Sequence, residues 1–142
     1  MGGIDMLCKE LQFGDWCCNK HGFPMQITNV GEDYAYATWE GNEGDPWEFD
    51  DKDDQPQPIP LTPEILEKNG IKKRRDEYAV FGWEGMKQWY ITLEDFKPQY
   101  DFWFITSSDR DLNISGQIRY VHQLQHALRI CGLDELADNF KV

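Results

Sequence analysis

Two histidines near the C-terminus have the spacing of a metal-ligand pair. His122 and His126 stand four residues apart in a helical pattern, so both imidazoles lie on one face of that helix. Cys17, Cys18 and His21 could add further ligands. The chain has neither the glutamate of an H-E-x-x-H site nor a C-x-x-C pair. We therefore expect no bound metal or other cofactor, and a small metal-dependent enzyme or sensor built on these residues is kept as an alternative.

An acid-rich segment provides a second candidate site. Residues 43–54 contain seven acids and one lysine, a net charge of −6, but lack the Asp-x-Asp-x-Asp-Gly pattern of an EF-hand calcium loop. The default interpretation of such a segment is a solvated loop, and the functional alternative is a docking surface in which aromatic side chains act as anchors. The candidate interaction surface combines two aromatic residues, four aspartates and the two helical histidines: Trp47, Phe49, Asp50, Asp51, Asp53, Asp54, His122 and His126.

Motifs for nucleophilic catalysis are missing from the sequence. Ser107 and Ser108 lack the Gly-x-Ser-x-Gly setting of a nucleophile elbow. The Gly82-x-x-Gly85 segment lacks the Lys and Ser or Thr that complete a phosphate-binding loop. The sequence therefore predicts a protein that is not an enzyme and that acts by binding another macromolecule.

The charge balance restricts the kind of partner. The 142 residues include 26 acids and 14 lysines and arginines, which gives a net charge of −12. Nucleic-acid affinity depends on basic side chains that displace counterions from phosphates, so we expect no nucleic-acid partner. An acidic surface is suited to a basic partner protein. A further alternative is that the acidic loop mimics nucleic acid and inhibits a host defence protein.

Cysteine content and hydropathy indicate the compartment. There are four cysteines, two of them adjacent, and the chain opens without a charged-then-apolar signal segment. Reduced thiols in a cytoplasm are the expected state. We expect no membrane association, because no apolar run approaches the roughly 20 residues that a membrane helix requires. The oligomeric state is left open by the sequence.

The predicted fold class is α+β. Apolar or alternating runs at 11–17, 23–28 and 34–39, separated by turn residues, predict a small antiparallel meander for which an SH3-like barrel is one possible form. Gly14 predicts a bulge or tight bend inside the first run. Residues 41–60, rich in Gly, Pro and acids, are expected to be a loop or linker.

The second half of the chain combines helices with a second meander. Thr62, Pro63 and Gly70 predict a short helix over 62–70. Strand-like runs at 78–83, 87–93 and 102–106 predict an antiparallel meander, and apolar residues at helical spacing predict a helix over 118–131 that packs on it. We expect a β-rich half at 1–58 and an α+β half at 59–142, with one shared compact domain as the alternative.

Two segments have sequences more particular than helix formation and packing alone require. Residues 58–70 (PIPLTPEILEKNG) and 120–132 (YVHQLQHALRICG) resemble a family of short uncharacterised proteins of gut anaerobic bacteria, their phages and mobile elements. Residues 11–16 (LQFGDW) approximate the Leu-x-x-Gly-Asn/Asp-aromatic start of that family. The resemblance covers about a quarter of the chain and implies a bacterial or phage origin. It implies no catalytic residue, because the family has no established activity.

Overall fold

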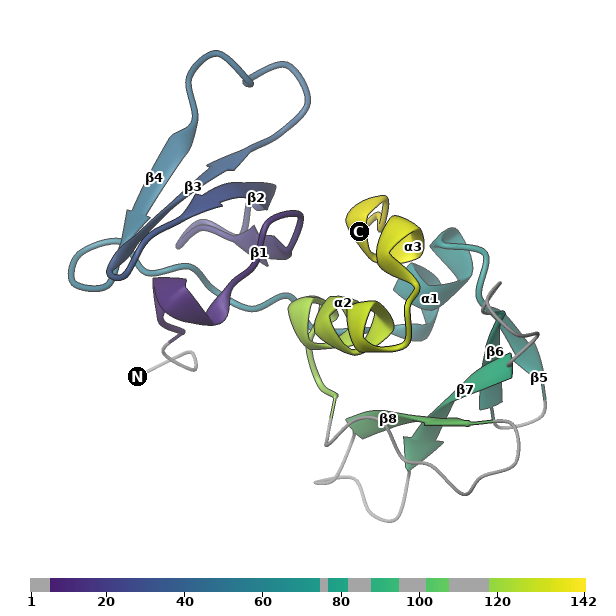
Figure 1. The fold of residues 1–142 in the computed structure, drawn as a ribbon. Coiled ribbons are helices and arrows are strands. Elements are labelled where there is room, and N and C mark those ends of the chain that lie inside the picture. Colours follow the sequence, from purple (N-terminus) through teal and green to yellow (C-terminus); the bar gives the residue numbers. More distant parts are fainter. Residues whose placement is uncertain (1–5, 75–76, 82–87, 95–101, 108–117) are drawn as a thin grey trace. The chain divides into compact units, whose positions relative to one another are not determined.

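The computed structural model describes residues 6–74, 77–81, 88–94, 102–107 and 118–142 (Figure 1), with only the backbone described over 72–107. The chain divides into two compact units, Met1–Ile59 and Pro60–Val142. The sequence places this boundary after residue 58. Both units contain an antiparallel four-stranded sheet, and the described helices of the second unit complete an α+β protein, so the predicted fold class is confirmed.

The first unit is a sequential antiparallel meander. A short 3₁₀ turn, η1 (Cys8–Glu10), precedes β1 (Trp16–Cys18), β2 (Pro24–Val30), β3 (Tyr34–Thr38) and β4 (Trp47–Asp50), and the strands lie in the order β1-β2-β3-β4 (Figure 1). Short connections join neighbouring strands, as expected for antiparallel pairs. Closure of this sheet into an SH3-like barrel stays a prediction.

Gly14 lies at a bend, as the sequence predicts. Its φ of 87° is in the left-handed region that glycine adopts without steric cost. At this bend the Gly14 N–H donates to the Ile27 carbonyl over 2.8 Å, and the Ile27 N–H donates to the Asp15 carbonyl over 2.8 Å. The bend therefore continues the pairing with β2 beyond the start of β1.

Strand β4 corrects the prediction that residues 41–60 are only loop. Trp47 and Phe49 alternate with Glu48 and Asp50, and the strand pairs with β3 over its whole length. The Gly, Pro and acid content of the surrounding segment conceals this alternation. A four-residue strand is stable here because the neighbouring strand supplies its hydrogen bonds and one buried face.

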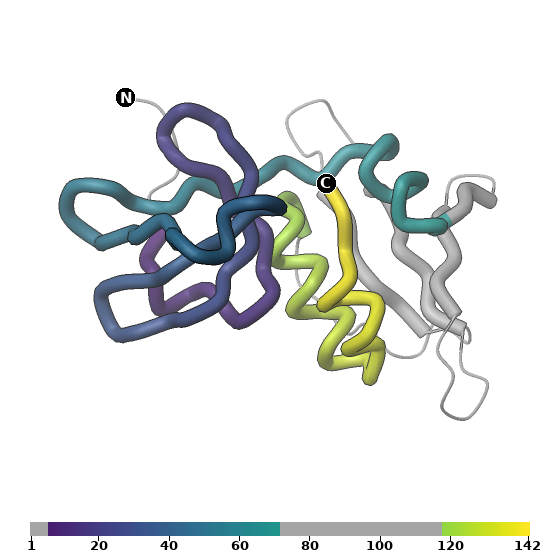
Figure 2. The backbone as a smooth tube through the Cα atoms, turned by 90° about the horizontal axis from the view of Figure 1, so that it is seen from above, coloured from purple at the N-terminus to yellow at the C-terminus, as the bar shows by residue number. Residues whose placement is uncertain are grey.

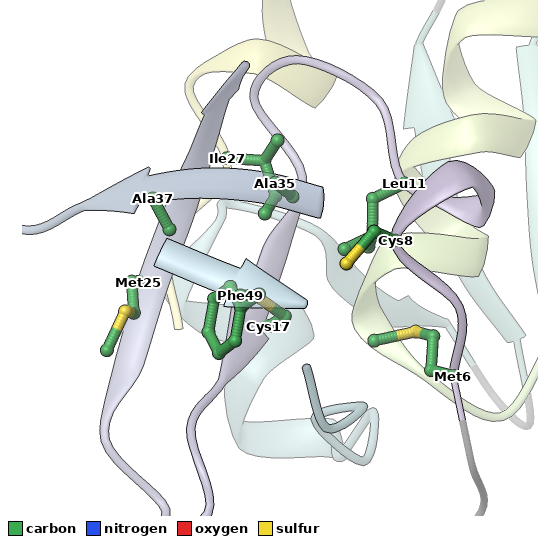
Figure 3. Close-up of a cluster of buried hydrophobic side chains, with 9 residues drawn as sticks. All are labelled: Met6, Cys8, Leu11, Cys17, Met25, Ile27, Ala35, Ala37 and Phe49. Atoms are coloured by element: carbon green, nitrogen blue, oxygen red, sulfur yellow. The ribbon is translucent and has the colours of Figure 1, made fainter. Parts of the chain in front are cut away.

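The core of the first unit lies on one face of the sheet. Alternate residues of β2 and β3 point inward, and Phe49 lies directly across from Ala35 in the β3–β4 register. The large ring therefore fills the space left by small alanines, which is how a dense core is packed. The buried cluster consists of Met6, Cys8, Leu11, Cys17, Met25, Ile27, Ala35, Ala37 and Phe49 (Figure 3).

Gln57 pairs with the outer edge of β1. The Cys18 N–H donates to the Gln57 carbonyl over 2.9 Å, and the Gln57 N–H donates back to the Cys18 carbonyl over 2.8 Å. Pro56 and Pro58 flank this bridge, and proline has no N–H to offer to a further strand. This arrangement discourages edge-to-edge association of the sheet with another chain.

In the second unit, α1 (Pro63–Lys68) forms where its N-capping and terminating residues predict. The Ile65 N–H donates to the Thr62 hydroxyl oxygen over 3.3 Å, which satisfies one of the free N–H groups of the first turn. Pro63 occupies the first turn, where its missing N–H costs nothing. Gly70 ends the helix with a φ of 76°, so both predicted boundaries are confirmed to within two residues.

Four strands follow α1 in a second meander. They are β5 (Lys72–Arg74), β6 (Glu77–Phe81), β7 (Gln88–Glu94) and β8 (Phe102–Ser107), in the order β5-β6-β7-β8. The last three confirm the predicted antiparallel runs. The sequence also predicts a turn at Glu84-Gly85 and a core face formed by Trp89, Ile91 and Leu93. Both lie outside the described residues and side chains.

The C-terminal helices α2 (Val121–Ile130) and α3 (Asp134–Asp138) lie side by side (Figures 1 and 2). The buried Gln125 links them, because its side-chain N–H donates to the Ala137 carbonyl over 2.9 Å. Asn69, after α1, bonds the backbone of Lys141 in both directions. Helix α2 starts three residues after the predicted position because the chain before it bridges to Pro60. The packing of α2 on the strands lies outside the described side chains.

We predict that Phe49→Ala destabilises the protein by roughly 3–5 kcal/mol, because the fully buried ring leaves a cavity in a core that cannot close it. Urea denaturation followed by circular dichroism measures this change. Val30→Ala, on the same sheet at a 38 % exposed side chain, is the matched control and should stay within about 1 kcal/mol of wild type. Equal effects of the two substitutions would contradict the core assignment.

Candidate functional site

The acidic segment is folded into an ordered turn after β4. Oδ1 of Asp50 accepts hydrogen bonds from the Lys52 N–H over 2.9 Å and the Asp53 N–H over 2.6 Å. The Asp50 N–H donates to the Asp54 carbonyl over 3.0 Å, which closes the turn. The hydrogen bond from the Asp53 N–H, and to a smaller extent that from the Lys52 N–H, lowers the pKa of the Asp50 carboxyl below its ordinary value.

Two more of the predicted docking aspartates bond within the unit. Oδ1 of Asp51 accepts from the Cys8 N–H over 2.8 Å, and this ties the turn to η1. Oδ2 of Asp54 accepts from the indole N–H of Trp47 over 3.0 Å. Asp50, Asp51 and Asp54 therefore stabilise the local fold, whereas Asp53 is exposed.

Of the two predicted aromatic anchors, Phe49 belongs to the interior and Trp47 is partly exposed. Phe49 is fully buried among the core residues and is unavailable to a partner, which corrects its assignment as an anchor. Trp47 is half-buried against the same cluster, with its ring centroid 6.5 Å from that of Phe49. Their position follows from the inward face of β4. Of the predicted surface, the aspartate turn and Trp47 lie together in the first unit.

His122 and His126 lie on α2 in the second unit. Their ring centroids are 5.7 Å apart with an interplanar angle of 80°, and Tyr120 stacks on His122 at 6.1 Å and 9°. His122 is only 8 % exposed, which corrects its assignment to an exposed interaction surface, and His126 is half-buried. The helical spacing therefore brings the two imidazoles together, as predicted, and the ring of Tyr120, the residue before the helix, extends the group.

The cysteine–histidine group suggested as a second ligand set is spread over different surfaces. Cys17 is buried in the core and Cys18 is half-buried on the opposite face of β1. The exposed His21 lies in the following turn, where its N–H donates to the Asn19 side chain. Among the residues that the structure describes, no three His, Cys, Asp or Glu side chains form a group that could hold a metal ion. The metal-dependent alternative stays a prediction.

All four cysteines are free thiols that burial makes poor nucleophiles. Burial, with the Asp51 carboxylate nearby, raises the pKa of Cys8 to about 12. Burial raises the pKa of Cys131 to about 11, and it also raises the pKa values of Cys17 and Cys18. Thiolates are therefore scarce at neutral pH, which matches a structural role for these side chains.

Sequence reasoning missed the outward residues of β3. Tyr34 and Tyr36 alternate with two buried alanines and point away from the core, with ring centroids 5.8 Å apart. Glu48 and Asp50 lie directly across from them on β4. The Tyr-Ala-Tyr-Ala alternation was the available signal, since it separates small inward residues from large outward ones.

Comparison of the chain with protein-family models, curated proteins and solved structures finds no match. The resemblance to short proteins of gut bacteria and phages therefore stays a prediction. Among the described helices, none is both long and apolar enough to cross a membrane.

We predict that the core thiols resist alkylation. At pH 8 a thiol with a pKa near 12 is ionised in about one molecule in ten thousand, so Cys8 in the folded protein should react with iodoacetamide at least ~100-fold more slowly than in urea. Mass spectrometry of timed samples locates the label, with Cys17 expected to behave in the same way. Equal labelling rates in buffer and urea would show that these thiols are accessible.

The lowered pKa of Asp50 predicts that the folded protein loses stability at acidic pH. Because the folded-state pKa lies below the unfolded value of about 3.9, its contribution to stability is complete above that value and is lost as the pH falls through the folded-state pKa. Carboxyl-carbon NMR should show a titration midpoint below 3.9. The stability difference between wild type and Asp50→Ala should also decrease over this acidic range. A midpoint at or above the ordinary value would exclude the hydrogen-bonded turn.

Proposed function

We propose that this chain is a non-enzymatic binding protein whose acidic first unit docks to a basic partner protein. The observation that supports it best is the distribution of charge between the two units. Met1–Ile59 contains 13 acids and three lysines, a net charge of −10, whereas Pro60–Val142 contains 13 acids and 11 basic residues, a net charge of −2. One small sheet unit therefore carries nearly the whole charge of the protein.

Most of the charge of the first unit is available to a partner. Its exposed acids lie in η1, in the turns and on β4: Glu10, Glu32, Asp33, Glu40, Glu43, Asp45, Glu48 and Asp53. Such a field attracts a basic protein, accelerates its association and repels phosphate backbones. Nucleic-acid mimicry is the narrower version of the same idea, but it loses support because three of its four aspartates bond within the fold.

Other observations are consistent with this proposal. Buried thiols with raised pKa values do not favour cysteine chemistry, and reduced cysteines suit the cytoplasm of a bacterium or of a phage-infected cell. We include the SH3-like closure of the β1–β4 sheet in the proposal, because small β domains of that type bind extended segments of partner chains. The resemblance to a bacterial and phage family provides the proposed origin.

The test is a comparison of charge-neutralised variants of the full chain. Glu32→Gln/Glu40→Gln/Asp53→Asn should weaken binding of a mixed Lys/Arg-rich peptide roughly tenfold at low salt, because each exposed pair contributes about 0.2–1 kcal/mol. Glu64→Gln/Glu67→Gln/Glu135→Gln changes the net charge equally in the second unit and should bind like wild type. Fluorescence anisotropy across a salt series measures both.

Binding by wild type should also weaken steeply as salt screens the acids. Failure of the wild-type chain to bind the peptide at low salt would contradict the proposed function. Equal weakening by the two triple variants would contradict the assignment of binding to the first unit.

A further inference from the structure

The outer face of β3 and β4 places aromatic rings beside carboxylates. In the antiparallel register Tyr34 lies directly across from Asp50, and Tyr36 lies directly across from Glu48. Directly opposed side chains share one face of the sheet, with Cβ atoms about 4.5–5.5 Å apart. We call these four residues the tyrosine–acid face.

The two rings of this face are held in a defined geometry. Their centroids are 5.8 Å apart at an interplanar angle of 70°, an edge-to-face arrangement. Tyr34 is 42 % exposed, so part of its ring is open to solvent. Its ring lies against the Cα of Gly31, where any Cβ would collide with it, and the Gly31 N–H donates to the Tyr34 carbonyl over 2.8 Å. The β2–β3 turn therefore fixes the position of the ring.

This combination of groups recognises a cationic side chain. An aromatic ring attracts a cation placed over its face, and an adjacent carboxylate adds a charge-assisted hydrogen bond. Arginine satisfies both better than lysine, because its planar guanidinium stacks on a ring and donates through several N–H groups. The charge of −10 on this unit favours approach of such a segment and opposes phosphates.

We propose that the tyrosine–acid face is the docking surface for an arginine-rich segment of the partner protein. This inference rests on the proposed function and adds to it the location of the contact and the preferred residue of the partner. The arginine side chain lies over Tyr34 and Tyr36 and bonds the exposed carboxylate of Glu48, while Asp50, whose Oδ1 is held by the turn, adds negative charge beside it. The exposed acids elsewhere on the unit attract any basic segment and do not distinguish arginine from lysine.

The experiment compares labelled oligoarginine and oligolysine peptides of equal length on the full chain by fluorescence anisotropy. Tyr34→Leu/Glu48→Gln removes one ring and one carboxylate from the face and should weaken oligoarginine binding roughly tenfold. Tyr34→Phe/Glu43→Gln is the matched control, because it keeps a ring at position 34 and removes one exposed acid outside the face. The control should bind within about twofold of wild type.

Gly31→Ala provides a second variant that changes neither the charge nor the aromatic content. It should displace the Tyr34 ring and reduce the preference for oligoarginine over oligolysine. Circular dichroism and urea denaturation confirm that each variant is folded. If Tyr34→Leu/Glu48→Gln is unfolded, Gly31→Ala and Glu48→Gln alone test the same face.

The outcomes separate the two proposals. Selective loss in the face variants supports the docking surface. Equal binding by the face variant and its control, with wild-type affinity intact, overturns the docking surface and leaves the proposed function standing. If wild type binds neither peptide at low salt, both proposals are overturned.

Discussion

The alternation of alanine and tyrosine along β3 determines both faces of the first sheet. Ala35 and Ala37 are fully buried, and their small size leaves room for the Phe49 ring directly across the β3–β4 pair. A slip of one residue would bring Tyr34 and Tyr36 into the core and move the alanines to the surface. The packing of the interior and the aromatic character of the outer face are therefore consequences of one register.

The acids of this unit serve two separate purposes. Carboxylates in the turn after β4 accept hydrogen bonds from nearby N–H groups, including that of Cys8, and these bonds stabilise the turn against the repulsion between its charges. Exposed acids elsewhere on the unit, among them Glu32, Glu40 and Glu48, create the field that a basic partner would meet. Because the second unit has a net charge of only −2, most of the negative charge of the chain belongs to the first unit.

Features determined by local sequence were predictable, and features determined by pairing were not. Thr62 and Gly70 act within one helical turn, so the position of α1 follows from their chemistry alone. Strand β4 is short and surrounded by turn residues, and it exists because β3 pairs with it, a contact that composition does not reveal. For the same reason composition places Phe49 on a surface although its ring is buried in the core, whereas the outward direction of Tyr34 and Tyr36 follows from their alternation with alanine. The histidine pair shows the same limit, since helical spacing predicts only that the two rings are neighbours.

The most direct test of the central claim, that arginine docks on the tyrosine–acid face, is a ¹⁵N NMR titration of the full chain with the oligoarginine peptide. Saturable amide shifts should be concentrated at Tyr34, Tyr36 and Glu48, with little change in α1, α2 and α3. Shifts spread evenly over every exposed acid, or concentrated in the second unit, would contradict it.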